Sequence, residues 1–179
     1  RERSLADRTP SPAPQPVRPT ARFMRGRLSH WIALGFGSGL SPVAPGTVGT
    51  LWAWLVFVVA DPLLAPAHWA IVLAAGFLIG IWACERTARD LGVADHGAVV
   101  WDEIVAFWLV LLFVPGGFGA QLAAFVLFRF FDIVKPPPIR HYDAKLKNGF
   151  GTMLDDLLAA FYTLLVLALF RAGFGGAAG

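Results

Sequence analysis

One charged stretch lies between two strongly apolar runs, and it reads R-F-F-D-I-V-K-P-P-P-I-R-H-Y-D-A-K-L-K-N-G-F-G-T-M-L-D-D, residues 129–156. It holds four Asp and five Lys or Arg residues. Charge between runs of this kind is costly and is kept mainly where it has a function. The triple proline at 136–138 removes three backbone donors and ends the preceding helix. With turn residues at 148–152, we expect a second helix to begin near Thr152.

The charged side chains of this stretch are open to two interpretations. Arg129, Asp132 and Lys135 recur at i, i+3 and i+6, so they share one face of a helix near its end. Asp155 and Asp156 are expected in the first turns of the next helix, where the macrodipole favours negative charge. The charges are therefore either ordinary helix-end residues or members of a functional cluster.

The composition of the whole chain indicates a membrane protein. Of its 179 residues 56% are hydrophobic and 15% are charged, and the mean hydropathy is +0.61; ordinary soluble domains have roughly a quarter charged. Apolar runs without a period of two predict an all-α integral membrane bundle with four to five short transmembrane helices. These runs cover residues 48–60, 69–83, 101–114, 120–131 and 154–170. Cys84 is the only cysteine, so no intrachain disulfide forms.

Two segments near the start differ from these runs. Residues 1–28 are rich in Pro and carry seven Arg against two acids, which predicts a disordered basic tail attracted to anionic lipid and not to nucleic acid. Residues 29–179 then form one membrane-embedded domain. The Gly- and Pro-rich segment 30–50 is expected to be a re-entrant or interfacial loop whose backbone N–H groups can receive an anion.

The basic residues orient the predicted helices. Lys or Arg occur in the tail, in 85–100 and in 129–152, whereas 61–68 and 115–119 contain none. The positive-inside rule therefore places the first three segments on the cytoplasmic side. The stretches with polar chemistry all lie on that side.

Carboxylates gather at this predicted level of the membrane. They are Asp102, Glu103, Asp132, Asp155 and Asp156. Like charges crowded in a low dielectric repel, so either several are protonated or a cation lies among them. Oxygen ligands favour magnesium, calcium or manganese, and magnesium leaves positions for phosphate oxygens. Arg129, Lys135 and Arg140 would complete a phosphate site, while His96 has either a turn-forming or a catalytic role.

Three motifs carry a family resemblance. They are G-F-G-S-G-L-S-P-V-A-P-G-T-V-G-T-L at 35–51, D-H-G-A-V-V-W-D-E at 95–103, and F-R-F-F-D-I-V-K-P-P-P-I-R-H-Y-D followed by G-F-G-T-M-L-D-D within 128–156. Over residues 30–170 the chain resembles the phosphatidylglycerophosphatase A family. The resemblance implies a magnesium-dependent phosphatase of the bacterial inner membrane that converts phosphatidylglycerophosphate to phosphatidylglycerol. With the orientation expected from the basic residues, its active site faces the cytoplasm and its phospholipid substrate lies in the cytoplasmic leaflet.

The site expected on these grounds has three groups of residues. The catalytic residues are expected to be Asp102, Glu103, Asp132, Asp155, Asp156 and His96. The metal ligands are expected among Asp102, Glu103, Asp132 and Asp156. The substrate phosphate is expected at Arg129, Lys135, Arg140, Ser41, Gly46 and Thr47.

Other classes and mechanisms stay open at this point. Intramembrane carboxylates also line ion paths, so a small ion-coupled transporter or channel is the alternative, although the chain lacks the internal repeat typical of transporters. Direct attack by water and an aspartyl-phosphate intermediate are both compatible with the carboxylates. The oligomeric state is not indicated by the sequence.

Overall fold

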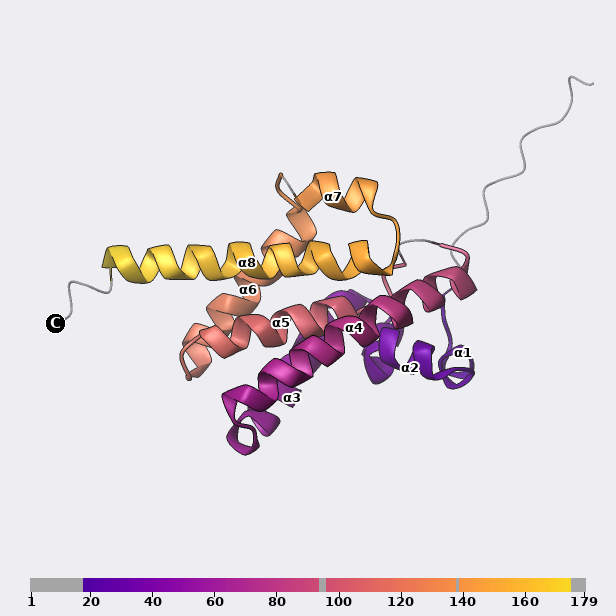
Figure 1. Cartoon of the computed structure of the whole chain (residues 1–179), viewed down its shortest axis with the longest axis horizontal. Helices are drawn as coiled ribbons and strands as arrows, with labels where there is room; N and C mark the ends of the chain where they lie inside the picture. Colours follow the sequence, from indigo (N-terminus) through magenta and orange to yellow (C-terminus); the bar gives the residue numbers. More distant parts are fainter. Residues whose placement is uncertain (1–17, 94–95, 138, 175–179) are drawn as a thin grey trace, which may run out of the picture.

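All the regular elements are helices in the part of the chain that the computed structural model describes, which comprises residues 18–93, 96–137 and 139–174 (Figure 1). The α-helices are α1 (Ala21–Arg25), α2 (Leu28–Ala33), α3 (Pro45–Ala60), α4 (Pro66–Leu91), α5 (Trp101–Phe113), α6 (Phe118–Val134), α7 (Ile139–Lys145) and α8 (Gly149–Phe174). Two short 3₁₀ segments, η2 (Gly35–Leu40) and η3 (Asp61–Leu63), flank α3. The predicted all-α class is confirmed.

Helix α5 forms the centre of the bundle. Nine of its 13 residues are buried, and it packs against α3, α4 and α8. Its buried tryptophans find backbone acceptors on two of these neighbours: the Trp101 indole donates to the Gly76 carbonyl and the Trp108 indole to the Ala53 carbonyl, each at 2.9 Å. Buried polar groups need such partners. The two bonds therefore fix how α5 lies against α4 and α3.

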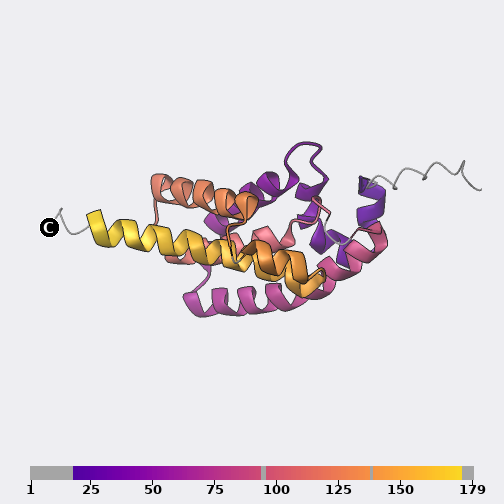
Figure 2. The same ribbon diagram turned by 90° about the horizontal axis from the view of Figure 1, so that it is seen from above.

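Small residues let α4 approach its neighbours closely. A Cβ at Gly80 would lie 2.5 Å from the Met153 sulfur and 2.8 Å from Trp101, and one at Gly76 would lie 3.1 Å from Val105. Small residues at such crossings allow close van der Waals packing between membrane helices. Figure 2 shows the result, with α8 lying along the bundle between α6 and α4.

Three helical segments are long and apolar enough to cross a membrane among the described residues. They are Pro45–Leu63, Pro66–Leu91 and Gly149–Gly173. Their outward faces expose large apolar side chains, such as Leu55 on α3, Leu78 on α4 and Leu169 on α8, as expected where lipid is the solvent. Helix α5, with 13 residues, and α6, with 17, are shorter. The chain is thus a helical membrane protein, and the count of four to five membrane helices stays a prediction.

Much of the predicted disordered tail, 1–28, lies outside the described residues. Within it, however, helix α1 is capped by Thr20, whose hydroxyl accepts from the Phe23 N–H at 3.2 Å, and Met24 is buried. Phe23 stacks on His30, which contacts Asp90 on α4 at 2.9 Å. Helical structure therefore occurs inside the range predicted to be disordered, because an apolar contact and a buried histidine tie it to α4.

The Gly- and Pro-rich segment folds into short turns that lead to α3. Within η2 the backbone is interrupted at Phe36 and Gly37, whose φ angles are 55° and 108°. Ala44, with φ 45°, precedes Pro45 at the first position of α3, where proline costs no hydrogen bond. The re-entrant or interfacial location of this segment stays a prediction.

Candidate active site

Three carboxylates from three helices meet at one end of the bundle. Glu103 on α5, Asp132 on α6 and Asp156 on α8 each offer an oxygen, and these oxygens all lie within 4.8 Å of one another. Glu103 and Asp132 have side chains only 13% and 11% exposed, and Asp156 is buried. Residues 53 positions apart in the sequence are therefore brought into one acidic centre, which contains three of the five carboxylates expected to gather at this level.

Arg129 joins two members of this carboxylate centre. Its Nη1 lies 3.0 Å from Glu103 Oε1 and 2.6 Å from Asp132 Oδ2, and 3.4 Å from the Thr50 hydroxyl. The Arg129–Asp132 contact is an i, i+3 pair on one helix, which is a favourable spacing. The sequence predicted Arg129 as a phosphate ligand, and the structure places its guanidinium against the carboxylates.

The start of α3 forms the wall of the centre beside Glu103. A Cβ at Gly46 would lie 2.0 Å from Glu103 Oε1 and 3.0 Å from Arg129 Nη2. A Cβ at Gly49 would lie 3.5 Å from Glu103 Oε2. At Gly46 only a hydrogen side chain allows α3 to approach the carboxylates so closely, whereas a Cβ at Gly49 would be in ordinary contact with Glu103 and would clash with Val100 at 2.8 Å.

Backbone donors are available at this same helix start. The first N–H groups of an α-helix have no intrahelical partner, and the N-cap residue of α3, Ala44, provides no side-chain hydrogen bond. Because Pro45 has no N–H, the donors come from Gly46 and Thr47, the residues that the sequence predicted for phosphate binding. Ser41, also predicted there, instead donates its hydroxyl to the Val43 carbonyl at 2.8 Å and stabilises the preceding turn.

Asp155 and Asp156 lie next to each other in the sequence and have different partners. Successive residues of a helix point about 100° apart, so Asp156 faces the carboxylate centre while Asp155 forms an ion pair with Lys135. Lys135 follows the last residue of α6 in a left-handed conformation, with φ 45°. This turn takes Lys135 off the helix face that it was predicted to share with Arg129 and Asp132.

The predicted start of the last helix was wrong. Helix α8 begins at Gly149 and not near Thr152, and the Asn148 side-chain oxygen accepts from the Gly151 N–H at 2.9 Å. The first turn of α8 therefore contains no acid. Since the macrodipole effect falls off within the first turn, it does not explain Asp155 and Asp156.

Three other predicted site residues are not among the three carboxylates whose oxygens lie within 4.8 Å of one another. Asp102 is buried on α5, and its Oδ1 accepts from the Glu103 N–H at 3.0 Å. His96 accepts from the Ala98 N–H at 3.1 Å through Nδ1, the turn-forming role considered for it. Arg140 is exposed on α7. Their catalytic or binding roles stay predictions.

Thr50 was not predicted as a site residue. It is fully buried, donates to the Gly46 carbonyl at 2.9 Å, and lies beside the Arg129 guanidinium. The spacing of Gly46, Gly49 and Thr50 is i, i+3, i+4, which places them on one helix face. The sequence shows this spacing, but it does not show that this face of α3 is turned toward the carboxylate centre.

The residues of the carboxylate centre fit a divalent cation. Glu103 Oε2 and Asp156 Oδ2 are buried and have no hydrogen-bond partner in the described structure, and buried carboxylate oxygens are costly in that state. The donors of the centre are hard oxygens, which suit magnesium, calcium or manganese. Glu103, Asp132 and Asp156 are therefore the residues that would hold the ion.

The helices and this centre define a membrane-embedded helical protein with a carboxylate-rich site at one end of its bundle. Comparison with known proteins then gives the family. The family model for phosphatidylglycerophosphatase A matches residues 31–171. This chain belongs to the phosphatidylglycerophosphatase A family, as its motifs predicted, and is a phosphatase. The alternative class, an ion-coupled transporter or channel, is therefore rejected.

Individual relatives agree with that assignment. The chain is 50% identical over 139 residues to the phosphatidylglycerophosphatase A of Haemophilus influenzae, covering 77% of this chain and 85% of the relative. It is 42% identical to that of Escherichia coli, covering 77% and 80%. A putative phosphatidylinositol-3-phosphatase of Bacteroides thetaiotaomicron is 41% identical over 148 residues, covering 78% and 91%. No solved structure matches the chain.

Proposed function

We propose that this protein hydrolyses the phosphomonoester of phosphatidylglycerophosphate, releasing phosphatidylglycerol and inorganic phosphate, in a magnesium-dependent reaction. Two relatives that carry the name phosphatidylglycerophosphatase A match more than three quarters of the chain. The observation that carries the proposal is the meeting of Glu103, Asp132 and Asp156 beside Arg129. A magnesium ion held by these carboxylates would supply positive charge against the negative charge that develops on the phosphate.

Arg129 is proposed to position the carboxylates. Its guanidinium holds Glu103 and Asp132 in fixed orientations, so that the three acids stay close in spite of their mutual repulsion. Thr50 supports the guanidinium from α3. Because Arg129 already contacts two carboxylates, its proposed role is to orient the side chains of the carboxylate centre and not to bind the substrate phosphate.

The start of α3 is proposed to receive the substrate phosphate. Gly46 and Thr47 offer N–H groups at the positive end of a 16-residue helix, immediately beside Glu103, and helix N-termini favour phosphate binding. Lys135 forms an ion pair with Asp155 on α8. In this proposal Lys135 contributes a second positive charge for the substrate phosphate at the same end of the bundle.

The proposed location is the bacterial inner membrane, with the site facing the cytoplasm. The start of α3, the end of α6 and the start of α8 all contribute to one end of the bundle. The connections at that end carry the Lys and Arg residues of 85–100 and 129–152, which supports a cytoplasmic location by the positive-inside rule.

The test is release of inorganic phosphate by the purified full chain in detergent. Phosphatidylglycerophosphate is the substrate, and phosphatidylinositol 3-phosphate is the comparison because one relative bears that activity in its name. We expect turnover of the first substrate, loss of turnover on chelation of divalent cations, and recovery on addition of magnesium. Full activity in excess chelator, or faster turnover of the phosphoinositide, would contradict the proposal.

A further inference from the structure

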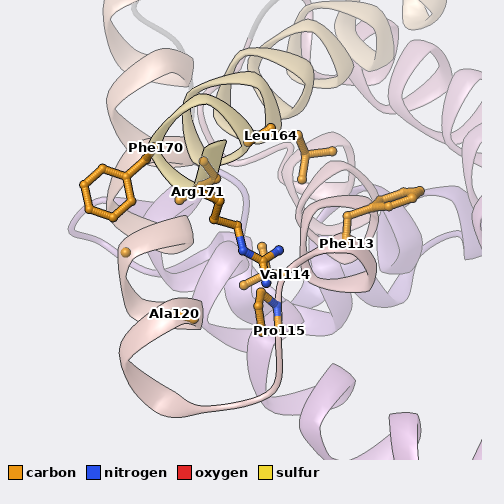
Figure 3. Close-up of a pocket in the computed structure, with 10 residues that line it drawn as sticks. Phe113, Val114, Pro115, Ala120, Leu164, Phe170 and Arg171 are labelled. Atoms are coloured by element: carbon orange, nitrogen blue, oxygen red, sulfur yellow. The ribbon is translucent and has the colours of Figure 1, made fainter. Parts of the chain in front are cut away.

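A cavity lies at the opposite end of the bundle from the carboxylates. It has a volume of about 540 Å³ and lies where the end of α5, the beginning of α6 and the end of α8 meet (Figure 3). Its wall is made by apolar side chains and one cation: Phe113, Val114, Ala120, Leu164, Leu167 and Arg171. A concave apolar space of this size is in the range of small-ligand sites.

The distance along α8 separates this cavity from the active site. Asp156 and Arg171 are 15 residues apart on one helix, which corresponds to about 22 Å of rise. The hydrocarbon core of a bilayer is about 30 Å thick. If α8 crosses the bilayer, the cavity lies toward the leaflet opposite the carboxylates, and a ligand there does not contact them.

Arg171 is an unusual residue for this end of the bundle. Residues 108–124 and 157–174 contain one Lys or Arg between them, and it is Arg171. Its side chain extends from α8 toward Val114 and Pro115 across the cavity (Figure 3), and it forms no ion pair with any described residue. Arg171 is exposed in the last turn of α8, where a cation suits the helix dipole, and its guanidinium is also able to bind an anionic headgroup.

The cavity also opens toward lipid. Phe113 is 66% exposed and Phe170 is 62% exposed at its edges. In a membrane protein such exposed apolar side chains contact acyl chains. An acyl chain can therefore enter the cavity from the side, and a headgroup can remain at the surface next to a long basic side chain.

From these observations we propose that the cavity is a binding site for one phospholipid of net negative charge, whose acyl chain lies between α5, α6 and α8 and whose headgroup contacts Arg171. The apolar wall selects the chain and the guanidinium selects the headgroup. The proposal does not depend on the reaction at the other end of the bundle.

The proposal is tested by lipid binding to the delipidated full chain in detergent, measured by native mass spectrometry. The probes are phosphatidylserine and phosphatidylcholine with identical acyl chains; neither is the expected substrate or product. We expect the wild type to bind phosphatidylserine about fivefold more tightly, the factor that corresponds to ~1 kcal/mol for one basic side chain near an anionic surface. Equal binding of the two lipids would overturn the proposal.

Variants locate the binding within the cavity. Arg171→Gln should abolish the preference for phosphatidylserine, whereas Arg171→Lys should keep it. Ala120→Phe should fill the space and weaken both lipids. Arg89→Gln, at an exposed arginine paired with Glu85, is the matched control and should behave as the wild type.

Two results would place the lipid elsewhere. One is an unchanged preference in Arg171→Gln, and the other is unchanged affinity in a folded Ala120→Phe protein. If Ala120→Phe does not fold, the comparison of Arg171→Gln with Arg171→Lys decides the question, because both substitutions preserve the bulk of the wall.

Discussion

Replacing Asp156 by Asn removes one charge from the carboxylate centre and almost no volume, and it should have opposite effects on stability and on turnover. When ionised, the three acids and Arg129 together carry a net charge of −2. Arg129 contacts Glu103 and Asp132, whereas Asp156 forms no ion pair among the described residues. Asp156 is thus the least compensated acid of the three.

The size of the stability effect follows from the distances. Two unit charges 4.8 Å apart repel by ~3.5 kcal/mol at an effective dielectric constant of about 20. The nearby guanidinium and protonation of one acid reduce this repulsion. We therefore expect Asp156→Asn to stabilise the metal-free protein by ~1–3 kcal/mol.

Turnover should change in the other direction. Loss of one ligand charge should lower kcat by at least about 100-fold, a barrier increase of ~2.7 kcal/mol. Magnesium at 100 times its dissociation constant should stabilise the wild type by ~2.7 kcal/mol. The same addition of magnesium should stabilise the Asp156→Asn variant much less, because the variant lacks one of the three carboxylate ligands.

The assay combines thermal unfolding in detergent, with and without magnesium, and phosphate release under the same conditions. Asp155→Asn is the control at the neighbouring position. It breaks the ion pair with Lys135 and should destabilise the protein by ~1–3 kcal/mol, because a partly buried ion pair is lost. The reasoning is refuted if Asp156→Asn destabilises the metal-free protein as Asp155→Asn does, or if it retains more than a tenth of the wild-type kcat.

Three further experiments test other parts of the structure. Gly46→Ala should lower kcat by at least tenfold, because the new methyl group would displace Glu103. Gly119→Ala is the control and should remain active, because a Cβ there meets nothing within 4 Å. Equal activity of the two variants would argue against the close approach of α3 to Glu103. A cysteine in place of the exposed Lys147 should resist an impermeant thiol reagent in intact cells, and labelling from outside would reverse the proposed orientation. Removing residues 1–17 should leave kcat within about twofold, since a Pro-rich basic segment cannot form a pocket; a tenfold loss in a folded protein would show that this segment takes part in catalysis.

The meeting of distant acids could be predicted from the sequence because of how the charges are distributed. Asp102 and Glu103 precede an apolar run, Asp132 ends one, and Asp156 begins another. Antiparallel connections then place these ends on one side of the bundle. Helix class and the shared level of the acids follow from this pattern alone.

The roles of the basic residues could not be predicted in the same way. Arg129 is one turn from Asp132, so both an ion pair and a phosphate contact are compatible with its spacing, and only the position of Glu103 shows which contact forms. The left-handed turn at Lys135 depends on how the chain passes the following prolines. Gly46 and Glu103 form a tertiary contact. The sequence shows that residue 46 is small, but it does not show which residue packs against it.

The length of α5 has a consequence for how substrate and water reach the carboxylates. Thirteen residues span about 20 Å, whereas the hydrocarbon core is about 30 Å thick, so both ends of this helix cannot lie at the two surfaces of an undeformed bilayer. If its far end lies near the surface, Glu103 is recessed by up to about 10 Å below the headgroups on the other side. A lipid would then present its phosphate to Glu103 from within its own leaflet, below the level of the neighbouring headgroups.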